Sequence, residues 1–211
     1  MKRIGYLLFL FTTITASGQA PHYTQSANGI ELVTLTPKEN INIPVYNLSG
    51  IFKAARKIIY IDSGNTYQVY VPKWLKLRQN NDVNFFGGTL PPVNTVENAI
   101  VISAAKKTQY KSFQDFKNYI IEDTAYLSGK APKWDTARKF LSVKKDLLSV
   151  PGSHSSYKVS FNRLGSIFVA SYLLVETKTS YLWIQFIATG ETYPANLPKF
   201  REFLQGFSPS I

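Results

Sequence analysis

The chain has 211 residues and a formal net charge of +11, with 24 lysines and arginines against 13 acids. Its content of 45% hydrophobic and 18% charged residues excludes a disordered chain, because disorder requires low hydrophobicity and high charge. The absence of cysteine excludes disulfide scaffolds, iron–sulfur clusters, cysteine-ligated zinc and thiol nucleophiles.

Residues 1–20 are organised like a secretory signal peptide. Lys2 and Arg3 precede a short apolar run at residues 6–11, and small residues lie in the positions before Ala20. The apolar run is too short to cross about 30 Å of hydrocarbon. We therefore predict export with cleavage at or just before Ala20, and an uncleaved N-terminal anchor is the alternative.

The mature chain is expected to be periplasmic or secreted in a bacterium. It would keep a charge of +9, because the first twenty residues hold two basic residues and no acid. An exported chain without cysteine fits a bacterial envelope better than a eukaryotic secretory pathway, where small domains usually carry disulfides. No later apolar stretch approaches the length of a membrane span, so none is expected in the mature chain.

The first part of the mature chain mixes unclear and clear signals. Residues 21–56 are poorly predicted, apart from a weak alternation at 30–35 that is typical of an edge strand. Residues 58–61 and 67–71 are β-rich runs joined by a polar turn, which predicts a β-hairpin that ends at Pro72.

Two further strands are predicted next. Residues 84–92 indicate a short strand with a kink or bulge at Gly87 and Gly88, which do not match a phosphate loop. Residues 99–105 are apolar at alternating positions on both faces, as in a buried strand.

Helical patterns follow these strands. Ser112 with Asp115 predicts a capping box that opens a helix, and Gly129 is expected near its end. Residues 134–148 carry apolar side chains at helical spacing, which favours a second helix, although a strand stays open there.

The last third of the chain carries the clearest pattern. Residues 156–161, 167–175 and 181–188 are predicted strands, and the second is apolar on both faces. A strand of that kind lies inside a sheet that is covered on both sides. A C-terminal helix is predicted, with Asn196 as its N-cap and Gly206 near its end.

These elements predict an α+β fold, a three-layer α/β/α sandwich in which residues 57–211 form one domain. The sheet is expected to be largely antiparallel, because most connections are short hairpins rather than long crossovers.

Three segments resemble the PsbP-like fold: YQVYVPKWLKL, FFGGTLPPVNTVENAIVI and YLWIQFIATGETYPANLPKFREFLQGF. That fold is shared by PsbP subunits of photosystem II, a class of Ran-binding nuclear import factors and some bacterial envelope proteins. The resemblance spans residues 57–207 and rests on the order of the elements. It implies an antiparallel sheet between helices and a non-catalytic accessory or binding role, and it transfers no functional residue.

The chain offers little catalytic chemistry. Its two histidines, His22 and His154, are isolated, so no catalytic, metal or cofactor site is predicted. Asp62 and Asn65 match part of a calcium loop but fit a hairpin turn better. Glu191 is the acid that we single out for a hydrolase with two converging carboxylates, although it also suits the start of the last helix.

A basic cluster lies between residues 130 and 145. Its members are Lys130, Lys133, Arg138, Lys139, Lys144 and Lys145. One interpretation is a patch for an anionic partner, such as acidic polysaccharide, lipid head groups or an acidic protein. The other is a solvated face of a generally basic protein. Nucleic acid is not expected as the partner of an exported protein.

Three classes of function stay open. The lack of catalytic groups and the fold resemblance favour a non-catalytic accessory or binding protein of the envelope, with an envelope protein or anionic polymer as partner. A carboxylate-dependent hydrolase would require two acids in one pocket. A basic adaptor for anionic envelope polymer or lipid would require the lysines on one exposed face.

Overall fold

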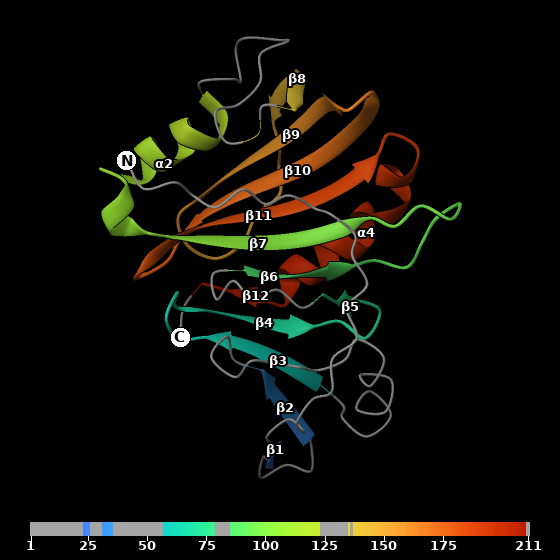
Figure 1. Cartoon of the computed structure of the whole chain (residues 1–211). Coiled ribbons are helices and arrows are strands. Elements are labelled where there is room, and N and C mark those ends of the chain that lie inside the picture. Colours follow the sequence, from blue (N-terminus) through green and yellow to red (C-terminus); the bar gives the residue numbers. More distant parts are fainter. Residues whose placement is uncertain are drawn as a thin grey trace.

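The computed structural model describes residues 23–25, 31–35, 57–78, 85–122, 135 and 137–209 (Figure 1). In chain order the elements are β1 (Tyr23–Gln25), β2 (Glu31–Leu35), β3 (Lys57–Asp62), β4 (Tyr67–Val71), β5 (Lys76–Leu77), β6 (Phe85–Thr89), β7 (Ala99–Lys106), η1 (Lys107–Gln109), α2 (Phe113–Lys117), η2 (Asn118–Glu122), β8 (Arg138–Lys145), β9 (His154–Arg163), β10 (Ser166–Glu176), β11 (Ser180–Thr189), α4 (Thr192–Gln205) and β12 (Phe207–Ser208).

The larger sheet of the described residues has the strand order β5-β6-β7-β11-β10-β9-β8, and each neighbouring pair is antiparallel. Strands β10 and β11 lie inside it and pair from Phe168 opposite Thr189 to Glu176 opposite Tyr181. The predicted central antiparallel pair is therefore confirmed, and so is the α+β class.

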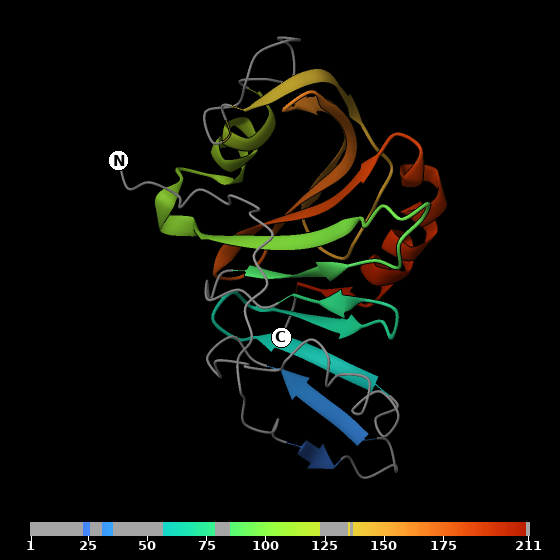
Figure 2. The same cartoon turned by 45° about the vertical axis from the view of Figure 1, so that its right-hand side comes forward.

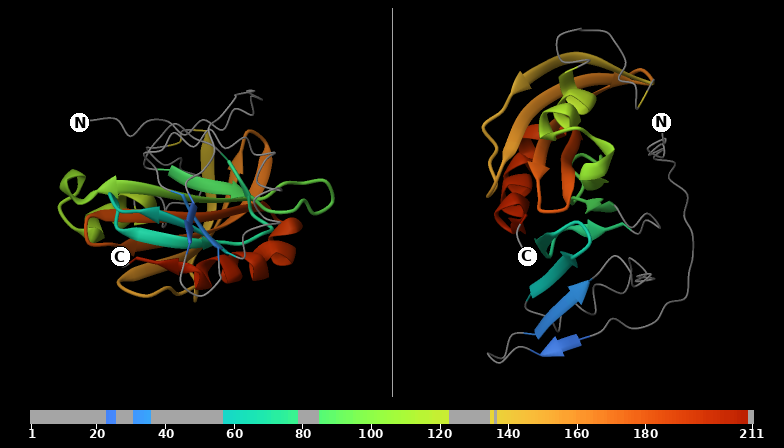
Figure 3. Two further views of the ribbon diagram at one scale, coloured as in Figure 1. Left: turned by 90° about the horizontal axis from the view of Figure 1, so that it is seen from below. Right: turned by 90° about the vertical axis from the view of Figure 1, so that its left-hand side faces the viewer.

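Buried side chains form two clusters, one on each face of this sheet. Leu173 and Val175 pack in the cluster that contains α4, whereas Tyr172 and Leu174 pack in the cluster that contains α2 and η2. Figures 2 and 3 show β8, β9 and β10 curving around α2, with α4 on the other side. We call the α2 side the inner face and the α4 side the outer face. Helices thus cover both faces, as the sandwich prediction requires.

A smaller sheet in the described residues has the order β1-β2-β3-β4-β12. Strands β3 and β4 pair antiparallel from Ile58 opposite Val71 to Asp62 opposite Tyr67, which confirms the predicted hairpin. Strand β2 lies between β1 and β3 and is parallel to β3, so the prediction of an edge strand at residues 30–35 is wrong. Its partner β1 has only three residues, which is too short to leave a sequence pattern.

A carboxylate organises the turn between β3 and β4. Asp62 accepts hydrogen bonds from the backbone N–H of Asn65 at 2.9 Å and from its side-chain amide at 2.8 Å. The amide oxygen of Asn65 accepts a hydrogen bond from the Ser180 hydroxyl at 2.7 Å. The predicted turn is confirmed, and it ties the smaller sheet to the start of β11.

The described part of residues 134–148 does not form the predicted helix. Arg138–Lys145 is strand β8, which pairs antiparallel with β9. The register shifts between Phe140 and Ser142, so Leu141 lies in a β-bulge and is 44% exposed, while Phe140 is buried. The bulge interrupts the two-residue alternation of a strand. A sequence with apolar residues on both sides of the bulge therefore imitates helical spacing.

Helix α2 begins where the sequence predicts. The Ser112 hydroxyl accepts a hydrogen bond from the backbone N–H of Asp115 at 3.1 Å, and the Asp115 carboxylate accepts one from the N–H of Lys111 at 3.0 Å. The helix continues into η2, a π-helical turn. The predicted end near Gly129 lies outside the described residues.

Helix α4 begins earlier than predicted. It starts at Thr192, and Asn196, the predicted N-cap, is buried within it. The hydroxyls of Thr189 and Thr192 lie 2.9 Å apart at this end and supply the polar contacts expected of a cap. Proline usually marks the first helical turn, but Pro198 lies inside this helix, which displaced the predicted start. Gly206 is the C-cap residue, as predicted.

Gly87 and Gly88 permit a close approach of neighbouring strands. Strand β6 is present as predicted, but its pairing with β7 runs through both glycines without a shift of register, so the expected bulge is wrong. A Cβ on Gly87 would lie 2.7 Å from the Ile100 carbonyl oxygen, and one on Gly88 would lie 2.6 Å from that of Lys76.

Buried tyrosines lead us to expect a loss of stability at alkaline pH. Burial raises the pKa of Tyr67 and of Tyr172 above the ordinary value of 10.0, because a phenolate would be desolvated there. The native state then holds protons that the unfolded state releases, so this stability is complete below about pH 10 and is lost as pH rises further.

Urea unfolding at several pH values tests this expectation. Above about pH 10, Tyr67→Phe should reduce the fall of the unfolding free energy by about 1.4 kcal/mol per pH unit, the effect of one proton. An identical slope in the variant and the unmodified chain would mean that this phenol is not buried in the native state.

Candidate functional site

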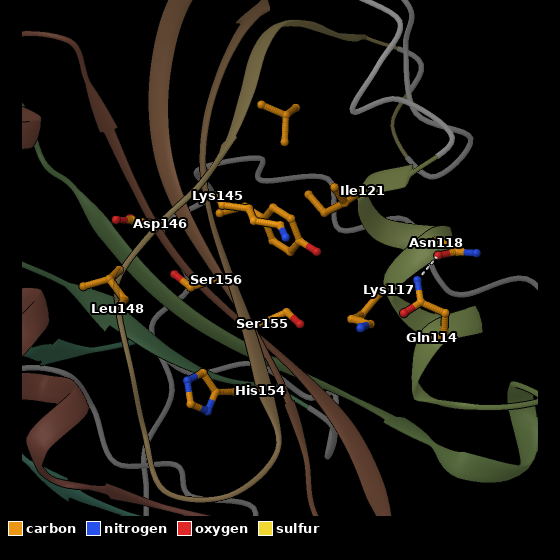
Figure 4. A pocket seen from close by; sticks show the side chains of 12 residues that line it. Gln114, Lys117, Asn118, Ile121, Lys145, Asp146, Leu148, His154, Ser155 and Ser156 are labelled. Atoms are coloured by element: carbon orange, nitrogen blue, oxygen red, sulfur yellow. Dashed lines mark hydrogen bonds between the residues drawn. The ribbon is translucent and has the colours of Figure 1, made fainter.

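A pocket of about 590 Å³ lies between two walls (Figure 4). One wall is formed by α2 and η2, and the other by the end of β8 and the start of β9. Its lining residues are Gln114, Lys117, Asn118, Ile121, Val143, Lys145, Asp146, Leu148, His154, Ser155, Ser156 and Tyr157. This volume falls in the range of about 300–1,000 Å³ that is usual for small-molecule sites.

The helical wall is placed by the cap at Ser112. Side chains one helical turn apart lie on the same side of a helix, so Lys117 and Ile121 face the strands together. The ammonium group of Lys117 lies 5.2 Å from the centre of the Phe113 ring, a cation–π distance that orients the lysine stem. On the same wall the Gln114 amide donates to the Asn118 side-chain oxygen at 2.6 Å.

The strand wall forms where β8 leaves β9. The last residue pair is Lys145 opposite Tyr157, and the backbone N–H of Asp146 still donates to the Ser156 carbonyl at 2.9 Å. Residues directly opposite each other in a sheet share a face, so Lys145 and Tyr157 both lie on the inner face. In Figure 4 the side chains of Lys117 and Lys145 extend into the pocket from opposite walls.

Ser156 contributes a buried polar group to this wall. The residue is 8% exposed, and its hydroxyl has no hydrogen-bond partner among the described residues. Ser156 lies opposite Leu173, whose side chain packs on the outer face, so Ser156 belongs to that face as well. The pocket therefore extends from the inner face past the edge of β9 that β8 leaves unpaired. A buried hydroxyl without a partner is unfavourable by about 1–3 kcal/mol, which a bound polar ligand would offset.

His154 begins β9 and its ring is held by the preceding turn. Its Nδ1 lies 2.9 Å from the Gly152 carbonyl oxygen, and because a carbonyl only accepts, Nδ1 carries the proton in this contact. Ser155 points to the opposite face of the strand from His154, and the Ser156 hydroxyl makes no hydrogen bond. Within the described residues, His154 therefore does not activate a serine nucleophile.

The charged residues of the pocket lining give it an excess of positive charge. Lys117 and Lys145 are opposed by Asp146, one of whose carboxylate oxygens accepts a hydrogen bond from the N–H of Leu147 at 2.8 Å. Three lining residues, Ile121, Val143 and Leu148, provide apolar contact. The arrangement suits a small molecule with an anionic group and an apolar part.

The described members of the basic cluster predicted from the sequence do not share one face. Lys130 and Lys133 lie outside the described residues. The others divide between two faces: Lys139 lies opposite Asn162 and Lys144 opposite Lys158 on the outer face, Lys145 lies in the pocket, and Arg138 is buried at 8% exposure. The division follows from the strand, because successive side chains of β8 point to opposite faces.

Arg138 belongs to a buried network on the inner face. Its guanidinium donates to the Tyr172 hydroxyl, lies 4.2 Å from the centre of the Phe161 ring and is 3.4 Å from the Asp135 carboxylate. Asp135 also pairs with Arg163 at 3.2 Å. Burial raises the pKa of Tyr172, and the neighbouring Arg138 charge opposes that rise. Arg138 therefore stabilises the fold and is removed from the surface patch.

The other residues named from the sequence either lie apart from the pocket or are not among the residues that the structure describes. Glu191 is exposed at the N-cap position of α4, where its side chain makes no capping hydrogen bond, and it does not line the pocket. His22 lies outside the described residues. In the part of the chain that is described, no three histidines or acids converge on a common metal position, and no helix is both long and apolar enough to cross a bilayer.

Sequence reasoning missed most of the pocket. Gln114, Lys117, Asn118 and Ser156 carry no motif, and the pocket depends on β8 separating from β9, which no local pattern indicates. The turn Pro151-Gly152 before His154 is the one available signal, since it marks where the chain reverses between β8 and β9.

Comparisons with known proteins add a likeness of fold. No protein-family model and no curated sequence matches this chain. Among solved structures, PA94 of Pseudomonas aeruginosa, a protein of unknown function, is 16% identical, with a TM-score of 0.43 over 65% of this chain and 88% of its own. LpqN of Mycobacterium tuberculosis, which is involved in cell envelope biogenesis, is 11% identical, with a TM-score of 0.47 over 78% of this chain and 98% of its own.

A PsbP is also among the similar structures. CyanoP of Synechocystis sp. PCC 6803 is 7% identical, with a TM-score of 0.37 over 71% of this chain and 90% of its own. With TM-scores below 0.5, these likenesses carry no argument about the family or the role of this chain.

Proposed function

We propose that this protein is an exported, non-catalytic binding protein of the bacterial envelope, and that the pocket holds a small anionic ligand. The observation that carries the proposal is the pair of lysines, Lys117 and Lys145, that enter one pocket from opposite walls. The unpartnered hydroxyl of Ser156 in the same lining supports it.

Export is supported by the sequence of residues 1–20, in which a basic start, an apolar run and small residues follow in the order of a signal peptide. In an oxidising compartment a chain of this size needs no disulfide, because roughly 190 residues bury enough surface to be stable.

A binding role fits the pocket better than catalysis. Nucleophilic catalysis requires a hydroxyl within hydrogen-bond reach of a base, and the Ser156 hydroxyl has no such partner in the described chain. Hydrolysis by two carboxylates requires a pair of acids in one pocket. Among the described lining residues Asp146 is the single acid, and Glu191 lies at the start of α4 instead.

Fluorescence titration with anilinonaphthalene sulfonate, an aromatic anion, tests the site in the purified mature chain. We expect saturable binding that Lys145→Glu weakens about tenfold, equivalent to about 1.4 kcal/mol, because the change replaces an attractive charge with a repulsive one. Lys117→Glu should act in the same direction from the opposite wall.

Lys139→Glu is the matched control. Lys139 is an exposed lysine of the same strand on the outer face, so it changes the net charge equally and leaves the pocket intact. Equal weakening by Lys139→Glu and Lys145→Glu would assign the binding to general charge attraction. Turnover of a substrate that requires Ser156 or His154 would replace the binding role with an enzymatic one.

A further inference from the structure

The turn between β9 and β10 contains a leucine that folding does not explain. Leu164 and Gly165 are its two residues, and both have positive φ, +52° and +85°. This two-residue type I′ turn favours Asn-Gly, because asparagine and glycine tolerate the left-handed conformation and leucine does not. Leu164 is 81% exposed, so burial does not offset the unfavourable conformation.

A second exposed apolar residue follows this leucine three positions later in the chain. Ile167, near the start of β10, is 57% exposed, whereas Leu173 and Val175 further along the same face of the strand are fully buried. Figure 1 places the β9–β10 turn at the end of the molecule opposite the smaller sheet. We call these two exposed aliphatic residues at the turn end of the hairpin the hairpin tip (Leu164 and Ile167).

The strands next to the hairpin tip carry positive charge and no acid. Neither β8 nor β9 contains an aspartate or glutamate. Ile167 lies opposite Asn162, which lies opposite Lys139, so Lys139 is on the same outer face as the tip isoleucine.

The same face also carries a pair of like charges. Lys144 lies directly opposite Lys158, an arrangement that destabilises a sheet. The ammonium group of Lys158 is 4.8 Å from the centre of the Tyr193 ring, while Lys144 is exposed. A negatively charged surface that contacts this face would relieve the repulsion.

We propose that the hairpin tip and the outer-face lysines Lys139 and Lys144 dock the protein on an anionic phospholipid bilayer. The tip enters the boundary between head groups and acyl chains, and the lysines contact the lipid phosphates. Each lysine near such a surface strengthens binding about fivefold. Two aliphatic side chains give too little area for a stable protein interface, which buries about 800 Å² per partner, whereas binding to an anionic membrane adds the attraction of the lysines to the apolar insertion.

This surface is separate from the pocket. The pocket lining on β9 ends at Tyr157, and Arg163 ends the strand six residues later, so the pocket and the hairpin tip are about 20 Å apart at about 3.3 Å per residue. The docking proposal therefore stands or fails independently of the pocket ligand.

Cosedimentation of the mature chain with phospholipid vesicles tests the proposal. We expect binding to vesicles of phosphatidylcholine mixed with phosphatidylglycerol and little binding to pure phosphatidylcholine. Leu164→Asn should lower the partition coefficient about fivefold while the thermal midpoint stays the same or rises, because asparagine is better suited to the turn. The joint substitution Lys139→Glu and Lys144→Glu should lower it at least as much.

Two matched controls make the outcome decisive. Leu147→Asn changes a leucine that is 99% exposed beside the pocket, and Lys145→Glu changes the lysine next to Lys144 on the opposite face. Both should keep vesicle binding, whereas Lys145→Glu should weaken binding of the sulfonate probe.

Three results would overturn the docking proposal. The first is the absence of binding to phosphatidylglycerol vesicles. The second is binding that Leu164→Asn leaves unchanged while the lysine changes abolish it, since that pattern identifies an anionic polymer as the partner. The third is crosslinking from position 167 to a protein rather than to lipid in the native envelope.

Discussion

Replacing Arg138 with alanine is expected to lower the free energy of unfolding by about 2–4 kcal/mol. The substitution removes a buried guanidinium that contacts the Phe161 ring and the Asp135 carboxylate, and it leaves the buried Tyr172 hydroxyl without this donor. Asp135 keeps its ion pair with Arg163 in the variant. We therefore expect a smaller loss of stability than for a buried charge that is left without any partner. Urea unfolding followed by circular dichroism gives the measurement.

The adjacent residue supplies the control for this prediction. Lys139→Ala should change the stability by no more than about 0.5 kcal/mol, because Lys139 is exposed on the other face of the same strand. The double change Arg138→Met with Tyr172→Phe should recover part of the loss, since it makes both partners apolar instead of leaving one unpaired. Equal effects of Arg138→Ala and Lys139→Ala would return Arg138 to the surface patch predicted from the sequence.

Strand β8 shows why a count of charges could not locate a site. Within one run of sequence, Arg138 stabilises the core, Lys139 and Lys144 face outward, and Lys145 lines the pocket. A helical interpretation groups them by a period of 3.6 residues, whereas the strand separates neighbours onto opposite faces. The bulge at Leu141 interrupts the two-residue period. The sequence therefore shows which charged residues are present but not which face of the strand each one occupies.

The central strands were predictable for the opposite reason. Both faces of β10 are apolar, and only a position inside a covered sheet buries both, so the pattern determines the placement. The turn at Asp62 was predictable because aspartate and asparagine act on their own backbone. The start of α4 was not, because Asn196 and Pro198 carry cap-like signals inside a helix that tertiary packing extends.

The pocket and the hairpin tip differ in how far sequence reasoning could reach them. The pocket exists because two paired strands diverge, and such long-range geometry has no local signal. The tip has one, because Leu164-Gly165 between two β-rich runs stands where Asn-Gly is expected. A residue that is unfavourable for its turn and remains exposed is the kind of local inconsistency that accompanies a functional surface.

Leu173→Ala is expected to lower the free energy of unfolding by about 2–5 kcal/mol. Leu173 is fully buried between Ile184 of β11 and Ser156 of β9, so its loss removes apolar burial and leaves a cavity that paired strands on both sides cannot close. The urea midpoint should fall with little change of slope, because the native and unfolded surfaces differ as before.

Leu147→Ala is the matched truncation, since this leucine is 99% exposed and its removal opens no cavity. It should leave the urea midpoint almost unchanged. A loss below about 1 kcal/mol in Leu173→Ala would place that side chain outside the core, because burial and cavity together exceed that value for a packed leucine. The central position of β10 would then be wrong. Both proposed surfaces depend on that position, because β10 pairs with β9.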